Sequence, residues 1–150
     1  MEKFFAYFLI IVSFVYTGAC LSIAFVDLPF VKTIQSFQEG LPVFADLLVR
    51  MGKLMAPQLV VLFLGILYFS ISNFRAEGSW SSYVPLLLIL SVLAITLLVH
   101  IPINKVVISG TISAENWKDS LYRWDLWHWI RTGISFLLSI SIFKYYKVFA

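Results

Sequence analysis

The sequence predicts an all-α integral membrane protein, a four-helix bundle that runs up-down-up-down through the bilayer. Two observations predict this class. Of the 150 residues, 61% are hydrophobic and only 13% are charged, which is too apolar for a soluble domain of this size. The charged residues also lie between long apolar runs, and four of these runs approach the roughly 20 residues that a helix needs to cross a hydrocarbon core of about 30 Å.

The predicted helices cover residues 4–26, 54–74, 83–103 and 124–143, within a single transmembrane domain of residues 1–150. The first run carries no charge. Small or weakly polar residues recur along it at helical spacing and share one face, which predicts close packing against another helix in lipid. These residues are Ser13, Thr17, Cys20 and Ala24, and Asp27 continues the same face just after the run.

The connections between the predicted helices differ in length. Residues 27–53 carry charges of both signs and two prolines, and we expect an interfacial segment here, with a short helix over 43–54. Residues 75–82 form a short polar turn. Pro102 predicts that the third helix kinks or stops beside His100. Residues 105–123 are expected to be a polar linker.

The charge pattern limits the partners but leaves the orientation open. Basic residues are spread between the apolar runs, so we expect a lipid bilayer as partner and no nucleic acid. The side of the long connections holds more Lys and Arg in total, whereas the side of the termini holds more per residue. We expect the termini in the cytoplasm. A homo-oligomer is compatible with the sequence.

The fourth run carries polar residues where a transmembrane helix has already begun. Trp124, His128 and Arg131 recur at helical spacing and share one face. A charge at the depth of Arg131 is costly and marks a functional residue by default. The structural alternative is that Arg131 reaches back to the interface or pairs with Asp27 or Asp125.

The third predicted helix ends at the same membrane level. Because the 105–123 linker joins it to the fourth, His100 and Asn104 can converge with His128 and Arg131 on one pocket. Further candidates for substrate binding are Trp124, Trp127 and Gln58, although these tryptophans also suit an interfacial belt and Gln58 a helix contact. No metal site is predicted, because neither histidine belongs to a spaced ligand set and Cys20 is the single cysteine.

Two motifs in this region resemble those of the anthrone oxygenase-like family of membrane proteins. The third helix ends in Pro-x-Asn at residues 102–104, and the fourth opens with Arg-Trp-x-x-Trp-His-x-x-Arg-Thr at residues 123–132. The four apolar runs match the layout of that family along the whole chain, but only residues 102–132 carry specific motifs.

The resemblance implies an oxygenase that converts an anthrone-like, lipophilic aromatic substrate to a quinone with O₂, without a metal or flavin cofactor. It assigns catalytic positions to Asn104, His128 and Arg131. A histidine suits the removal of a weakly acidic C–H proton near neutral pH. Arginine and asparagine suit the stabilisation of the oxyanion that then develops.

Two other functions remain open from the sequence. His100 and His128 could be axial ligands of a haem from adjacent helices, or bind a metal. Alternatively, Arg131 and His128 could hold a lipid head group or a partner helix in a subunit without enzymatic activity.

Overall fold

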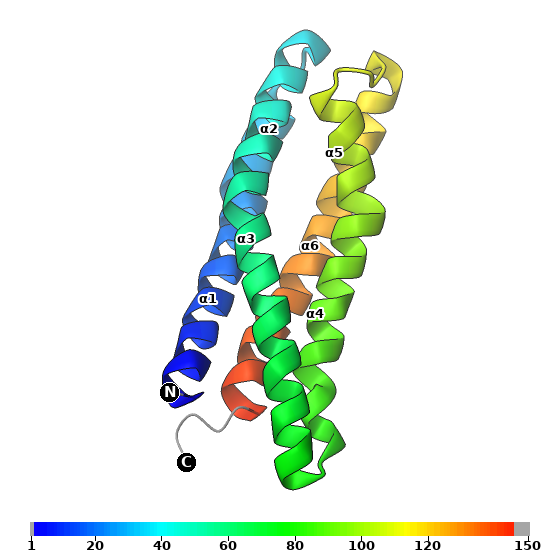
Figure 1. The fold of residues 1–150 in the computed structure, drawn as a ribbon. Coiled ribbons are helices and arrows are strands. Elements are labelled where there is room, and N and C mark those ends of the chain that lie inside the picture. Colours follow the sequence, from blue (N-terminus) through cyan, green and yellow to red (C-terminus); the bar gives the residue numbers. More distant parts are fainter. Residues whose placement is uncertain (1, 146–150) are drawn as a thin grey trace.

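A computed structural model describes residues 2–145, and all of its regular elements are helices. Four helical stretches are long and apolar enough to cross a membrane, which confirms the predicted all-α, multi-pass class. Figure 1 shows them side by side. Both described chain ends lie near the turn at Gly78 and Ser79, and the other two connections lie at the opposite end.

The first stretch contains α1 (Glu2–Ser22), a π-helical turn (Ile23–Asp27) and α2 (Leu28–Thr33). The second is α3 (Phe37–Glu77). The third begins with a 3₁₀ turn (Trp80–Tyr83) and continues through α4 (Val84–Ile95), a second π turn (Thr96–His100) and α5 (Ile101–Ile108). The fourth is α6 (Ala114–Tyr145). Each predicted span lies inside one of these stretches.

The expected interfacial helix over 43–54 is not a separate element. It is the first part of α3, whose 41 residues run without interruption through Pro42 and Pro57. A helix of that length extends about 60 Å at 1.5 Å per residue, so it projects well beyond the hydrocarbon core. The charged residues of this part remain exposed, and Arg50 pairs with Asp46 one turn away at 2.8 Å.

The predicted polar linker at 105–123 is also shorter than expected. Helix α5 continues to Ile108 and α6 already begins at Ala114. Trp117, expected in the linker, is buried on α6 and meets Phe44 of α3 edge to face, with 5.7 Å between the ring centroids. This aromatic packing favours a longer helix over the loop that the polar composition suggested.

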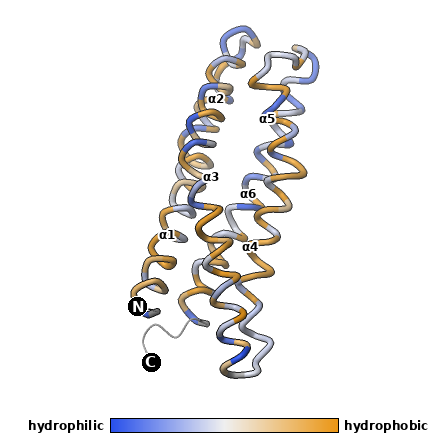
Figure 2. Tube along the Cα trace, viewed as in Figure 1, coloured by the Kyte–Doolittle hydropathy of each residue, from blue (hydrophilic) through white to orange (hydrophobic). Residues whose placement is uncertain are grey.

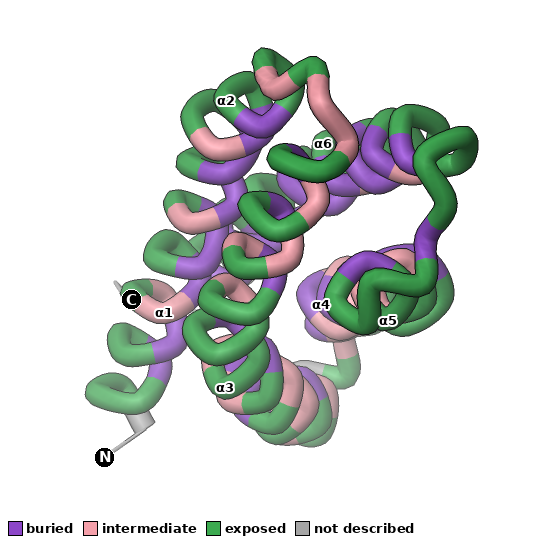
Figure 3. Tube along the Cα trace, turned by 90° about the horizontal axis from the view of Figure 1, so that it is seen from above, coloured by how far each residue is buried: buried purple, intermediate pink, exposed green. Residues whose placement is uncertain are grey.

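The distribution of side chains fits a membrane setting. Large apolar residues such as Phe14, Leu64 and Leu98 are exposed on the outer surface, where lipid would cover them. Figure 2 shows that hydrophilic residues gather mainly at the end that carries the α5–α6 connection. Figure 3, a view along the helices, shows buried residues along their inward faces.

The first and fourth stretches pack through the predicted face of small residues. Ser13, Thr17, Cys20 and Ala24 are all buried, and Asp27 is half-buried. The Thr17 hydroxyl donates to the Ser135 carbonyl of α6 at 3.1 Å and lies 3.1 Å from the Ser139 hydroxyl. Helix α6 therefore lies between α1 on one side and α4 on the other.

Replacing Gly65 with alanine is expected to lower the thermal unfolding midpoint. The added Cβ would lie 2.5 Å from Cδ2 of Leu9, a fully buried side chain of α1. Overpacking lowers the free energy of unfolding by about 1–3 kcal/mol, whereas the better helix propensity of alanine raises it by at most about 1 kcal/mol. Gly133→Ala is the matched control, since nothing lies within 4 Å of its added Cβ. Equal midpoints in detergent for both variants would contradict this packing.

Candidate functional site

His100 comes from an irregular turn of the third stretch. Pro102 has no N–H to donate to the preceding turn, and the chain accommodates it with the π turn Thr96–His100 rather than by ending the helix. His100 is 1% exposed, and neither ring nitrogen has a hydrogen-bond partner. A buried imidazole left in this state is available to a ligand, because an unsatisfied buried polar group costs about 1–3 kcal/mol.

His128 lies on α6, with its ring centroid 6.2 Å from that of His100, and both of its ring nitrogens have hydrogen-bond partners. Nε2 lies 2.9 Å from the Cys20 carbonyl oxygen, and Nδ1 lies 2.8 Å from Nη2 of Arg131. A carbonyl can only accept and a guanidinium can only donate. The network therefore assigns a neutral imidazole to His128, with its hydrogen on Nε2 and a lone pair on Nδ1 facing Arg131.

Arg131 is a buried cation without a carboxylate partner. It is 5% exposed, its Nε has no hydrogen-bond partner, and no ion pair to it exists within residues 2–145. The expected structural alternative was a pair with Asp27 or Asp125. Within the described residues neither carboxylate forms an ion pair with Arg131, and Asp125 pairs instead with Lys32 of α2. A buried charge that lacks a counter-ion is expensive, so this position favours an anionic ligand.

Asn104 is fixed by the aromatic ring beside His100. The Trp124 indole Nε1 donates to Asn104 Oδ1 at 2.8 Å. Because an indole N–H can only donate, the amide oxygen of Asn104 must face it, which leaves the amide nitrogen as a free donor. The Trp124 ring also stacks on His128 at 4.8 Å with planes 12° apart and lies 4.8 Å from the His100 ring.

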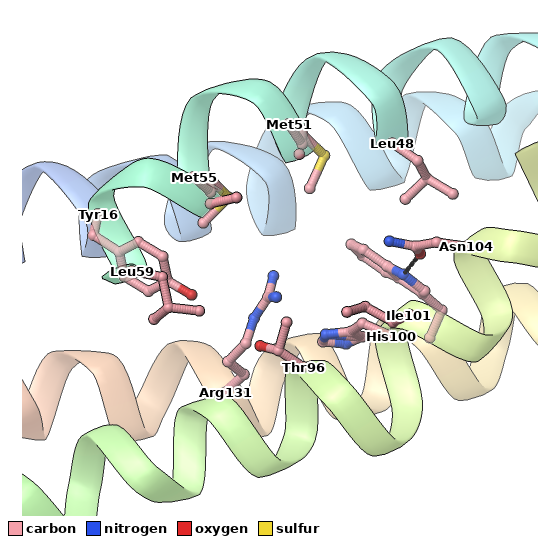
Figure 4. Close-up of a pocket in the computed structure, with 13 residues that line it drawn as sticks. Tyr16, Leu48, Met51, Met55, Leu59, Thr96, His100, Ile101, Asn104 and Arg131 are labelled. Atoms are coloured by element: carbon pink, nitrogen blue, oxygen red, sulfur yellow. Dashed lines mark hydrogen bonds between the residues drawn. The ribbon is translucent and has the colours of Figure 1, made fainter. Parts of the chain in front are cut away.

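Four of these side chains, those of His100, Asn104, Trp124 and Arg131, line a cavity of about 210 Å³. Figure 4 shows Arg131, His100 and Asn104 along one wall, facing Met51, Met55 and Leu48 of α3. The cavity is therefore apolar on one side and carries a cation, an imidazole and an amide on the other. Its lining residues are Tyr16, Leu48, Met51, Gly52, Met55, Ala56, Leu59, Thr96, His100, Ile101, Asn104, Trp124 and Arg131.

The sequence matches the model of one known protein family. The model described as anthrone oxygenase matches residues 46–140. The chain belongs to the anthrone oxygenase family. Comparisons with curated proteins and with solved structures give no match. The segment shared with the anthrone oxygenase family includes the α3 wall of the cavity and the polar wall opposite, whereas Tyr16 and Cys20 lie outside it.

The structure brings together four of the predicted site residues around the cavity: His100, Asn104, Trp124 and Arg131. His128 is fully buried and does not line the cavity, but it contacts two residues that do, Arg131 and Trp124. Two predicted substrate-binding residues, Trp127 and Gln58, are half-buried and do not line the cavity. Gln58 Oε1 has no hydrogen-bond partner.

Sequence reasoning missed several residues that line the cavity. Tyr16 comes from α1, and only its position next to the small-residue face gave any signal. Thr96 lies one turn before His100, so helical spacing could have identified it. The apolar wall from Leu48 to Leu59 gave no signal, because leucine and methionine are ordinary residues of any membrane helix.

The haem alternative fits this arrangement poorly. Axial ligation needs a free ring nitrogen on both histidines, whereas His128 would have to release either Cys20 or Arg131. Within the described residues, no group of three or more His, Cys, Asp or Glu side chains lies together as a metal site.

Proposed function

We propose that this protein is a membrane-embedded oxygenase that converts a flat, lipophilic anthrone-like phenol to the corresponding quinone. The observation that carries the proposal is the buried Arg131 without a counter-ion, facing a cavity that also holds the free imidazole of His100. An organic anion formed inside the cavity would supply the missing negative charge. Membership in the anthrone oxygenase family supports the choice of substrate class.

The reaction balances without an external reductant. A base removes one proton from the anthrone methylene carbon, which leaves an extended enolate. This carbanion forms a C–O bond with O₂, and the peroxide takes up the proton. The O–O bond then breaks as the second methylene proton leaves, giving the second carbonyl and one water. The substrate thus supplies all four electrons that reduce O₂.

The residues around the cavity suit these steps. His100 is positioned to accept the methylene proton, because both of its nitrogens are free and it lines the cavity. Arg131 and the free amide N–H of Asn104 would donate to the enolate oxygen as charge develops there. Trp124 and the methionines of α3 would hold the flat ring system between apolar surfaces.

In this proposal His128 is a positioning residue rather than the base implied by the family resemblance. Its Nδ1 lone pair accepts from Arg131 and its Nε2 is fixed by the Cys20 carbonyl. Removal of a proton by His128 would require one of these bonds to break first. His100 needs no such rearrangement.

The direct test is oxygen uptake by the purified protein in lipid nanodiscs with 1,8-dihydroxyanthrone. We expect one O₂ consumed per quinone formed, at a rate well above that of empty nanodiscs and unchanged after treatment with a metal chelator. Binding of the quinone without oxygen uptake would refute the oxygenase and favour a binding protein. A Soret band or stoichiometric metal linked to turnover would refute the proposed mechanism.

A further inference from the structure

The cavity has an opening on the side of the molecule. Most residues that line it are buried or half-buried, but Gly52 and Ala56 of α3 both line the cavity and lie exposed on the outer surface. They are one helical turn apart and therefore on the same face of α3. A Cβ added to Gly52 would meet nothing within 4 Å, so the space beside this residue is empty.

The opposite rim of the opening belongs to the third stretch. Helix α3 packs against α4 and α5, and Thr96 and Ile101 from this stretch line the cavity and are half-buried. Glycine and alanine are the two smallest residues, so on the α3 side almost no side chain closes the space between the helices. Larger residues, Met51 and Met55, stand beside them, and methionine is unusually flexible.

The opening lies where the apolar parts of the helices end. On α3 the run without charged residues begins after Lys53, next to Gly52, and on α5 it ends before Lys105, next to Asn104. Lys53 and Lys105 are both exposed. The opening is therefore level with the boundary between acyl chains and head groups, where amphipathic aromatic molecules are most stable.

We propose that the substrate enters the cavity sideways from this level of the bilayer, between Gly52 and Ala56 of α3 and Ile101 of α5. The inference rests on the proposed function, because it takes the same phenolic tricycle as the occupant. A lipophilic tricycle dissolved in the membrane would reach Arg131 and His100 without crossing bulk water. Gly52 and Ala56 then set the width of ligand that passes.

The test uses larger side chains at the opening, with Gly52→Leu and Ala56→Leu in nanodiscs. The probe is 1,8-dihydroxyanthraquinone, whose association is followed by stopped-flow quenching of tryptophan fluorescence. We expect each substitution to slow association at least tenfold. Dissociation of preloaded 1,8-dihydroxyanthraquinone should slow as well, because a narrower opening hinders movement in both directions. Faster dissociation would show that the leucine side chains only displace the ligand from the cavity, and would overturn the lateral route.

Gly133→Leu is the matched control, because Gly133 is exposed on α6, its added Cβ meets nothing within 4 Å, and it does not line the cavity. Its association rate should equal that of the unmodified protein. Unchanged association in both Gly52→Leu and Ala56→Leu would overturn the lateral route while leaving the oxygenase intact. Quinone binding through this opening without any oxygen uptake would refute the oxygenase alone, and absence of binding to the unmodified protein would overturn both.

Discussion

Replacing Arg131 with glutamine is expected to lower kcat/KM for 1,8-dihydroxyanthrone by about 10²- to 10³-fold, the loss typical of removing one oxyanion donor. Glutamine keeps a donor in the cavity but removes the charge that the enolate needs. Arg131→Lys should recover part of the rate, because an ammonium restores the charge without the planar fork that also reaches His128. Steady-state quinone formation in nanodiscs measures both effects.

Arg123→Gln provides the control for Arg131→Gln. Arg123 lies on the same helix but is exposed and does not line the cavity, so its replacement should leave kcat/KM unchanged. The Arg131→Gln variant should unfold at the same temperature as the unmodified protein or higher, because it removes an unpaired buried charge. Full activity in Arg131→Gln would refute the role of this residue, whereas a lower unfolding temperature would point to a structural one.

The second large effect is expected at His100. His100→Ala should lower kcat by about 10²- to 10⁴-fold, the usual contribution of a general base, with a much smaller change in KM. The reason is that His100 lines the cavity with both nitrogens free, so its loss removes a proton acceptor rather than a support. An exogenous imidazole small enough to enter the cavity should restore part of the rate.

Variants of His128 distinguish two possible roles of this residue, the catalytic base and a residue that positions Arg131. His128→Leu removes the acceptor for Arg131 and should mainly raise KM, because Arg131 is then free to turn away from the substrate. His128→Asn offers an amide oxygen near the position of Nδ1 and should recover much of that loss. A kcat lowered equally by His128→Asn and His100→Ala, without rescue, would return the role of base to His128.

Much of the fold follows from the sequence because bilayer thickness sets a fixed length for an apolar helix. The charge-free runs at 4–26 and 54–74 thus located two spans without any knowledge of their neighbours. The same reasoning failed where helices leave the hydrocarbon core. Residues 43–54 and 114–123 are charged, yet they are helical because their inner faces pack, as Trp117 does against Phe44.

For the site, the sequence determined which unusual residues lie at one membrane level: a histidine and an asparagine around Pro102, and a histidine and an arginine one turn apart on the fourth helix. Helical periodicity and the cost of an intramembrane charge are local properties, so they can be read from the chain alone. These properties could not show which of the two histidines has a free ring nitrogen, since His100 and His128 are both single histidines in apolar helices.

Only the tertiary structure decided that difference. The Nε2 atom of His128 is hydrogen-bonded to the carbonyl of Cys20 on α1, 108 residues away in sequence. Asp125 forms its ion pair with Lys32 of α2, so Arg131 has no counter-ion. The opening beside Gly52 and Ala56 likewise exists only because α3 passes α5 at their level. Hydrogen-bond partners and cavities depend on which helix faces meet, and no pattern within one helix specifies its neighbour.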